Sequence, residues 1–154
     1  MSDPEPDQSM SPEWSLDDLF VGQESPELTG SLEEASVKAK GLSDRYNGRI
    51  HELDGNELAK LIQQFERLQD TLGRIISYAQ LLYAADMGNP SVSQFFQTMQ
   101  ERCTDISTNV LFVTLELNRI EEERLSKLMK TPALVEYGPW IRDRRVFRPY
   151  QLSD

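Results

Sequence analysis

The chain has 154 residues, 38% of them hydrophobic, and its 16 Lys and Arg residues against 26 Asp and Glu residues give a formal net charge of −10. This acidic excess disfavours nucleic acid and anionic membranes as partners, because phosphate binding requires a basic face. No run approaches the roughly 18 apolar residues of a membrane span, and the acidic N-terminus lacks the apolar core of a secretory signal. We therefore expect a single domain, for which 154 residues are long enough, and a cytoplasmic location, which a single cysteine also fits.

Residues 1–12 are rich in Pro, Ser, Asp and Glu and offer little to bury, so we expect a disordered acidic tail ahead of a helical domain over residues 13–154. The motif WSLDDLF at residues 14–20 then concentrates four large apolar side chains. It is too short to fold alone. We expect it to dock onto the helices as an extended arm or a single turn, and we favour this over a peptide-like partner motif.

A first long helix is predicted over residues 26–47. Ser25, followed by proline, is a typical helix start, and Gly48 is a typical stop. The apolar residues between them recur at steps of four and three: Leu28, Leu32, Ala35, Ala39, Leu42 and Tyr46. Gly30 and Gly41 each weaken this helix by about 1 kcal/mol relative to Ala, so packing must compensate.

A second long helix is predicted over residues 55–86, with Asp54 or Asn56 as its cap. Its apolar face is about two residues wide: Leu58, Leu61, Ile62, Phe65, Leu68, Leu72, Ile75, Ile76, Ala79, Leu82 and Tyr83. Gly73 is a candidate for close approach by a neighbouring helix. The Gly-Asn-Pro turn at residues 88–90 is so short that the next helix must run antiparallel.

The longest predicted helix covers residues 90–120 and is capped by Asn89. Its apolar residues are spaced by three or four over eight successive intervals: Val92, Phe95, Met99, Cys103, Ile106, Val110, Val113, Leu117 and Ile120. The β-branched residues of ISTNVLFVTLEL do not interrupt this spacing. We therefore expect one continuous helix, about 45 Å long, as the spine of the fold.

Shorter helices are predicted over residues 121–130, 132–137 and 139–147, with Thr-Pro and Gly-Pro pairs between them. No stretch alternates convincingly as a strand. The predicted fold class is all-α, an antiparallel bundle of long helices with shorter C-terminal helices and no sheet. Leu152-Ser153-Asp154 resembles the start of a further capped helix, so we expect the chain to be the front part of a longer protein.

No residue is predicted to be catalytic, cofactor-binding or metal-binding. Cys103 lies on the apolar stripe and is expected to be a small buried hydrophobe, and His51 lies in a polar connector and is expected at the surface. One His and one Cys do not suffice for an ordinary zinc site. A Gly-rich phosphate loop, an H-E-x-x-H motif and a G-x-S-x-G motif are all missing from the sequence.

Two sets of side chains leave alternatives open. The first can form a local anion site, although a solvated or acid-paired helix face fits better: Arg142, Arg144, Arg145 and Arg148. The second can line a binding groove, although the edge of the core fits better: Tyr78, Tyr83, Tyr137 and Tyr150.

Several stretches are more specific than helical spacing. They are WSLDDLF, SYAQLLYAAD at 77–86, ERCTDISTNVLFVTLELNRIEEERLSKLM at 101–129, and TPALVEYGPWIRDRRVFRPYQLSD at 131–154. In this order they resemble the N-terminal region of the oligoendopeptidase F family, zinc peptidases related to thimet oligopeptidase. None of them is a catalytic motif, so the resemblance concerns architecture and lineage.

The resemblance implies a nearly all-helical protein with two lobes around a deep channel for oligopeptide substrates. In that family zinc is held by H-E-x-x-H and a downstream Glu in the C-terminal half, and the Glu of the motif activates the zinc-bound water. This chain lacks that region. We therefore expect an N-terminal lobe that forms one wall of the channel, is catalytically silent alone, carries no cofactor itself, and has the missing catalytic lobe as its partner.

The main alternative is a stand-alone acidic helical module that binds another protein, and a weaker one is an enzyme that uses Tyr and carboxylates. A lobe without its partner should expose an apolar patch or bury it by self-association. The candidates for that patch are the C-terminal aromatic residues and a second apolar row: Ile76, Tyr83, Phe96, Leu111 and Leu115.

Overall fold

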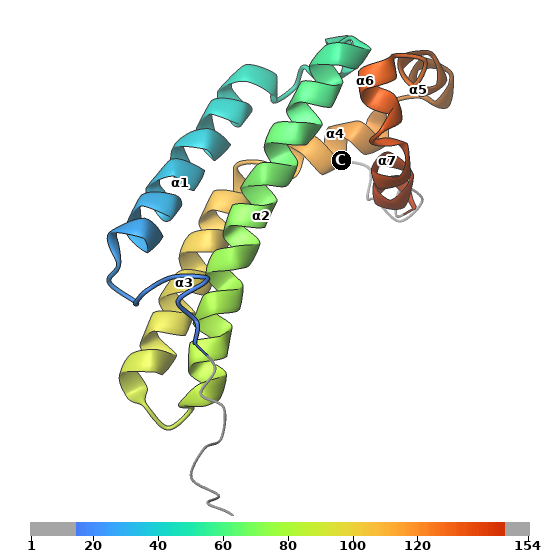
Figure 1. Ribbon diagram of the computed structural model, residues 1–154. Coiled ribbons are helices and arrows are strands. Elements are labelled where there is room, and N and C mark those ends of the chain that lie inside the picture. The colour runs from blue at the N-terminus through green and yellow to red at the C-terminus, as the bar shows by residue number, and fades with distance from the viewer. Residues whose placement is uncertain (1–14, 147–154) are drawn as a thin grey trace, which may run out of the picture.

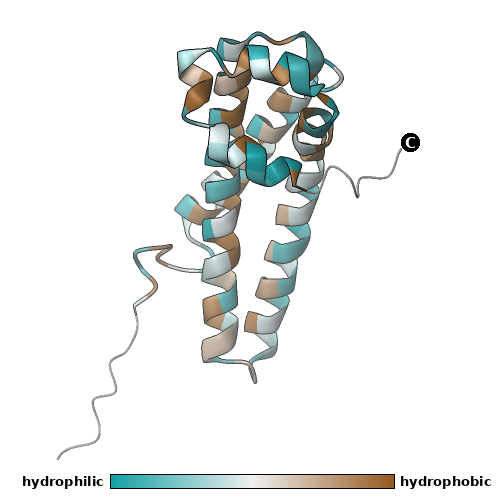
Figure 2. Ribbon diagram, turned by 90° about the vertical axis from the view of Figure 1, so that its right-hand side faces the viewer, coloured by the Kyte–Doolittle hydropathy of each residue, from teal (hydrophilic) through white to brown (hydrophobic). Residues whose placement is uncertain are grey.

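The computed structural model describes residues 15–146, and within this range every regular element is helical (Figure 1). Three long helices lie side by side: α1 (Pro26–Tyr46), α2 (Gly55–Ala85) and α3 (Pro90–Thr108). Four short helices gather at the end away from the α2–α3 turn (Figure 2): α4 (Leu111–Arg119), α5 (Glu122–Leu128), α6 (Pro132–Val135) and α7 (Gly138–Arg145). The predicted all-α class is confirmed.

Each long helix begins at the cap that the sequence indicates. The Ser25 hydroxyl accepts a hydrogen bond from the Leu28 N–H at 3.3 Å, and the Asn89 side chain accepts one from the Ser91 N–H at 3.0 Å. Asp54 and Glu57 form a reciprocal capping box, in which each side chain accepts from the other's backbone N–H. Caps of this kind stabilise a helix by about 1 kcal/mol each.

The core follows the predicted stripes. All six apolar positions of α1 are buried. Most of the wide face of α2 is buried, against both α1 and α3, although Ile76, Leu82 and Tyr83 are half-buried. The prediction for Gly73 is wrong, because a Cβ there would meet nothing within 4 Å. The close approach occurs at Gly55 instead, where a Cβ would lie 2.0 Å from the Thr131 hydroxyl oxygen.

The prediction of one continuous helix over residues 90–120 is also wrong, since α3 ends at Thr108 and α4 begins at Leu111. The side-chain amide of Asn109 donates to the carbonyl oxygen of Asp105 at 2.9 Å, which is the acceptor that its own backbone N–H would use in an α-helix. That N–H donates to Ile106 instead. The last turn therefore tightens, and α4 runs across the bundle (Figure 1).

The shorter helices begin within one residue of their predicted starts and end two residues earlier than predicted. A 3₁₀ turn, η1 (Ile50–Glu52), lies in the α1–α2 connector. The WSLDDLF motif docks as a single turn from Leu16 to Phe20, and Phe20 is buried edge-on against Tyr78. Trp14, the predicted acidic tail and residue 147 lie outside the described residues.

Candidate functional site

Arg145 of α7 is a buried residue whose side chain caps the C-terminal end of α4. Arg145 is 9% exposed, and its guanidinium donates to the carbonyl oxygens of Leu117 at 2.6 Å and Ile120 at 2.8 Å. It also pairs with Glu122 at the start of α5. The last carbonyls of a helix have no partner within it, so a buried guanidinium is a strong substitute. Arg145 therefore locks α4, α5 and α7 together.

The other predicted arginines do not join Arg145. Arg144 lies over the Trp140 ring at 5.2 Å from its centroid, Arg142 is exposed, and Arg148 lies outside the described residues. The sequence left open a local anion site or a solvated or acid-paired helix face, and Arg145 is acid-paired, with Glu122. Its burial is not readable from the sequence, because Arg145 looks like one basic residue of an exposed helix end.

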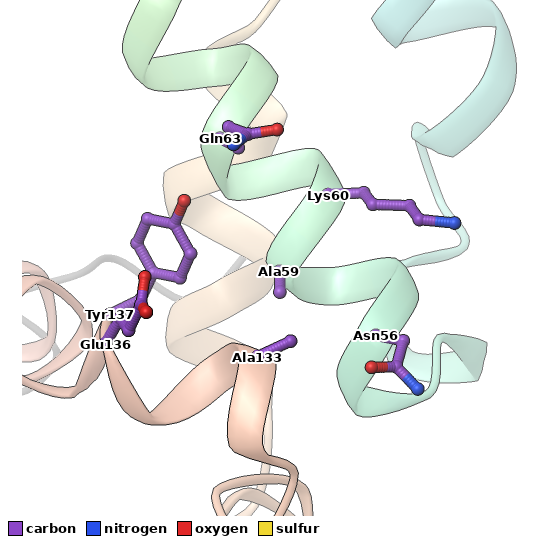
Figure 3. Close-up of a pocket in the computed structure, with 7 residues that line it drawn as sticks. All are labelled: Asn56, Ala59, Lys60, Gln63, Ala133, Glu136 and Tyr137. Carbon is purple, nitrogen blue, oxygen red and sulfur yellow. The ribbon is translucent and has the colours of Figure 1, made fainter.

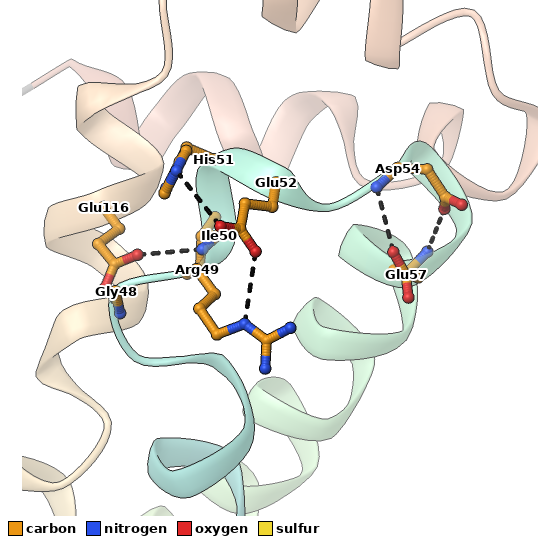
Figure 4. A network of polar contacts seen from close by, with 8 residues as sticks. All are labelled: Gly48, Arg49, Ile50, His51, Glu52, Asp54, Glu57 and Glu116. Carbon is orange, nitrogen blue, oxygen red and sulfur yellow. Dashed lines mark hydrogen bonds and ion pairs between the residues drawn. The ribbon is translucent and has the colours of Figure 1, made fainter.

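Glu116 of α4 ties the short helices to the α1–α2 connector (Figure 4). One carboxylate oxygen accepts from the Gly48 N–H at 2.6 Å and the other from the Ile50 N–H at 3.1 Å. Gly48 has a φ of +79°, which glycine adopts without strain. Nearby, Arg124 donates to the Leu53 carbonyl at 3.1 Å. Glu116 was not a candidate in the sequence, where it resembles an ordinary surface acid.

A groove of about 560 Å³ lies between the N-terminal half of α2 and the end of α6 (Figure 3). Its side chains are mostly hydrogen-bonding groups: Asn56, Lys60, Gln63, Glu136 and Tyr137, with Ala59 and Ala133 between them. In Figure 3 the Tyr137 ring lies beside Glu136, and Lys60 extends away from both. Burial raises the pKa of Tyr137, and the negative charges of Glu66 and Glu136 raise it further. The phenol therefore stays a neutral hydrogen-bonding group.

The predicted tyrosines have different surroundings. Tyr137 packs at the edge of the core, as the favoured alternative predicts, and it also lines this groove. Tyr78 is buried against Phe20 and Phe95. Tyr83 stacks on Phe96 with ring centroids 5.2 Å apart. Tyr150 lies outside the described residues.

The predicted apolar row does not form one surface. Ile76, Tyr83 and Phe96 are only half-buried, and Tyr83 and Phe96 cover each other on the α2–α3 hairpin. Leu111 and Leu115 are 57% and 37% exposed on α4, on the opposite side of the break after Thr108. Exposed apolar side chains are therefore concentrated, among this set, on α4.

The single cysteine and the single histidine lie apart. Cys103 is buried in α3, and burial raises the pKa of its thiol from 9.0 to about 11, so it is not an activated nucleophile. His51 is exposed, with Glu52 3.8 Å away. Residues 15–146 contain no group of three or more His, Cys, Asp or Glu side chains that could hold a metal.

None of the described helices combines the length and the hydrophobicity needed to cross a bilayer. In the comparison with protein families, the family model of the N-terminal region of M3 peptidases, described as Oligopeptidase F, matches residues 116–154. Over residues 116–154, the resemblance to the oligoendopeptidase F N-terminal region is confirmed. No curated protein and no solved structure matches the chain significantly.

The matched segment begins at Glu116 and includes α5, α6 and α7. Its contacts with the preceding residues are specific: Glu116 to Gly48 and Ile50, Arg124 to Leu53, and Thr131 against Gly55. The oligoendopeptidase F-like segment is therefore built onto the end of the three-helix bundle.

Proposed function

We propose that this chain is the N-terminal helical lobe of an oligoendopeptidase F-like zinc metalloendopeptidase located in the cytoplasm. The family match over residues 116–154 carries the proposal. The contacts of Glu116, Arg124 and Thr131 with the α1–α2 connector and the start of α2 support extending it to the preceding helices. Zinc and the H-E-x-x-H residues would come from the catalytic lobe, and this chain alone is catalytically silent.

We assign the channel wall to the groove between α2 and α6. Asn56, Gln63 and Tyr137 place amide and phenol groups along it, and these can both donate to and accept from the backbone of an extended oligopeptide. Leu111 and Leu115 on α4 are suited to contact with the catalytic lobe, because they are apolar side chains left exposed in this chain. In its absence they would support self-association.

The test uses the purified chain and a separately purified catalytic region of an oligoendopeptidase F that carries H-E-x-x-H. Alone, the chain should not hydrolyse a quenched fluorescent oligopeptide, with or without added zinc. Mixed together, the two should co-elute in size-exclusion chromatography, and peptide hydrolysis should rise. Peptide hydrolysis by the pure chain would contradict catalytic silence. Separately, sedimentation equilibrium of the chain alone measures its self-association.

Two pairs of variants sharpen this test. Leu111→Glu should weaken co-elution, whereas Val37→Glu on α1, which is also exposed, should not. Tyr137→Phe should raise KM for the oligopeptide in the mixture, whereas Tyr83→Phe should leave it unchanged. A chain that neither co-elutes nor raises hydrolysis contradicts the lobe assignment and favours the stand-alone interaction module.

A further inference from the structure

A second hollow lies between α1 and α2, outside the segment that matches the peptidase family. It has a volume of about 320 Å³ and is lined by five residues of α1, from Lys38 to Tyr46, together with Gln64 and Arg67 of α2. Clefts of a few hundred Å³ suit small molecules. This volume is at the lower end of that range, so the hollow fits a compact ligand.

The polar lining of the hollow is basic. Lys38, Arg45 and Arg67 line it and no Asp or Glu does, although the chain carries a net charge of −10. Lys38 pairs with Glu34 along α1 at 2.6 Å. Among residues 15–146, neither Arg45 nor Arg67 pairs with a carboxylate. Two guanidinium groups are therefore available, and this group binds carboxylate and phosphate through paired hydrogen bonds.

The remaining lining is apolar except for the Gln64 amide. Leu42 and Tyr46 are buried and contribute to the wall from α1. The Arg45 guanidinium lies 5.0 Å from the Tyr46 ring centroid, a cation–π contact that restrains one of the two available cations beside the hollow. Gly41 lies beside open space, because a Cβ there would meet nothing within 4 Å. A ligand that enters can thus contact apolar side chains and cations together.

We propose that this hollow binds a small organic anion, with its carboxylate or phosphate held by Arg45 and Arg67 and its apolar body against Leu42 and Tyr46. Lys38 adds positive charge at the rim. The site goes beyond the proposed peptidase function, since none of its residues lies in the matched segment. It would give the lobe a ligand other than an oligopeptide.

The test titrates the isotope-labelled chain with four probes and follows its backbone amide signals by NMR. Phenyl phosphate and benzoate combine an anionic group with an apolar ring, whereas inorganic phosphate and benzyl alcohol each lack one part. At least one of the first two should shift the signals of Gly41, Leu42 and Gln64 saturably, and the tighter of them identifies the preferred anionic group. Each incomplete probe should bind about tenfold more weakly.

Variants separate this site from general charge attraction. Arg67→Gln should weaken binding about tenfold, whereas Arg102→Gln, which removes the same charge from the exposed face of α3, should leave it unchanged. Gly41→Leu should abolish binding by filling the hollow while α1 keeps its helicity. The absence of saturable shifts, equal binding of inorganic phosphate and phenyl phosphate, or unchanged affinity in Arg67→Gln each overturns the proposal.

Discussion

The Arg145 guanidinium donates a 2.6 Å hydrogen bond to the carbonyl oxygen of Leu117, 28 residues earlier in the chain. One side chain thereby satisfies the end of α4 and fixes α7 against it. Because the guanidinium is buried, its removal takes the charge-assisted donor away from both carbonyls. The Leu117 carbonyl then keeps only the long 3.3 Å hydrogen bond from the Ile120 N–H.

Arg145→Met should lower the free energy of unfolding by about 3 kcal/mol, because the buried guanidinium loses its charge-assisted hydrogen bonds to the Leu117 and Ile120 carbonyls and its ion pair with Glu122. Urea denaturation followed by circular dichroism measures this change. Arg142→Met on the exposed face of α7 is the control and should stay within about 0.5 kcal/mol of the parent chain. Equal effects of the two substitutions contradict the assigned role of Arg145.

Glu116→Ala should destabilise the chain by about 1–2 kcal/mol, because the N–H groups of Gly48 and Ile50 lose their acceptor. Glu116→Gln keeps one acceptor oxygen and should cost less. Thermal unfolding of both variants gives the order. Glu33→Ala, on the exposed face of α1, is the matched control, and a loss there as large as that of Glu116→Ala would refute the bridging role.

Gly55→Ala and Gly73→Ala should act in opposite directions. At Gly55 the added methyl meets Thr131, so the substitution should destabilise through overpacking by about 1–3 kcal/mol. At Gly73 the methyl meets nothing within 4 Å, so helix propensity should stabilise the chain by about 0.5–1 kcal/mol. The urea concentration at the midpoint of unfolding measures the effect of each substitution. Midpoint shifts of the same sign would contradict the difference in packing between Gly55 and Gly73.

Stability should fall as the pH rises from about 9 to about 11, partly because of Cys103. Its thiol pKa is raised from 9.0 to about 11 in the folded chain, so the folded state favours the neutral thiol. This contribution is fully present below pH 9 and is lost as the pH passes the folded pKa. Tyr78 and Tyr137, whose pKa values are also raised by burial, contribute to the alkaline loss.

The Cys103 contribution is isolated by comparison with Cys103→Ala. The difference in unfolding free energy between the two chains should shrink across this pH range, whereas the tyrosine contribution is common to both. Thiol alkylation gives a second measurement, since the buried Cys103 should react slowly until the chain unfolds. A pH-independent difference contradicts the assigned thiol pKa.

Local periodicity accounts for most of the fold, because burial on a helix repeats every three or four residues. The stripe from Ile106 to Ile120 illustrates both the strength and the limit of this signal. Its five apolar residues are all buried as predicted, yet the backbone breaks between Thr108 and Leu111. At the break, the Asn109 side chain takes the Asp105 carbonyl that its own backbone N–H would use in an α-helix. The spacing of apolar residues carries no information about this polar contact.

The groove between α2 and α6 and the contacts of Arg145 and Glu116 were not predictable from local periodicity, because they depend on residues far apart in sequence. Arg145 meets residues 23 to 28 positions earlier, and Glu116 meets Gly48 across 68 positions. Tyr137 lines a groove because α6 lies on α2, which no local pattern specifies. The absence of catalytic motifs, in contrast, was readable directly from the residue types present.

The contact between Glu116 and Gly48 also has a kinetic consequence. It closes a loop of 68 residues, whereas the α2–α3 hairpin forms from sequence neighbours across a short turn. Closing a long loop costs conformational entropy before the contact at its ends can stabilise the chain. The α2–α3 hairpin should therefore nucleate folding, and α4–α7 should dock late. In the native protein α4–α7 should also unfold locally before the rest, so the backbone amides of these helices should exchange with solvent before those of α2.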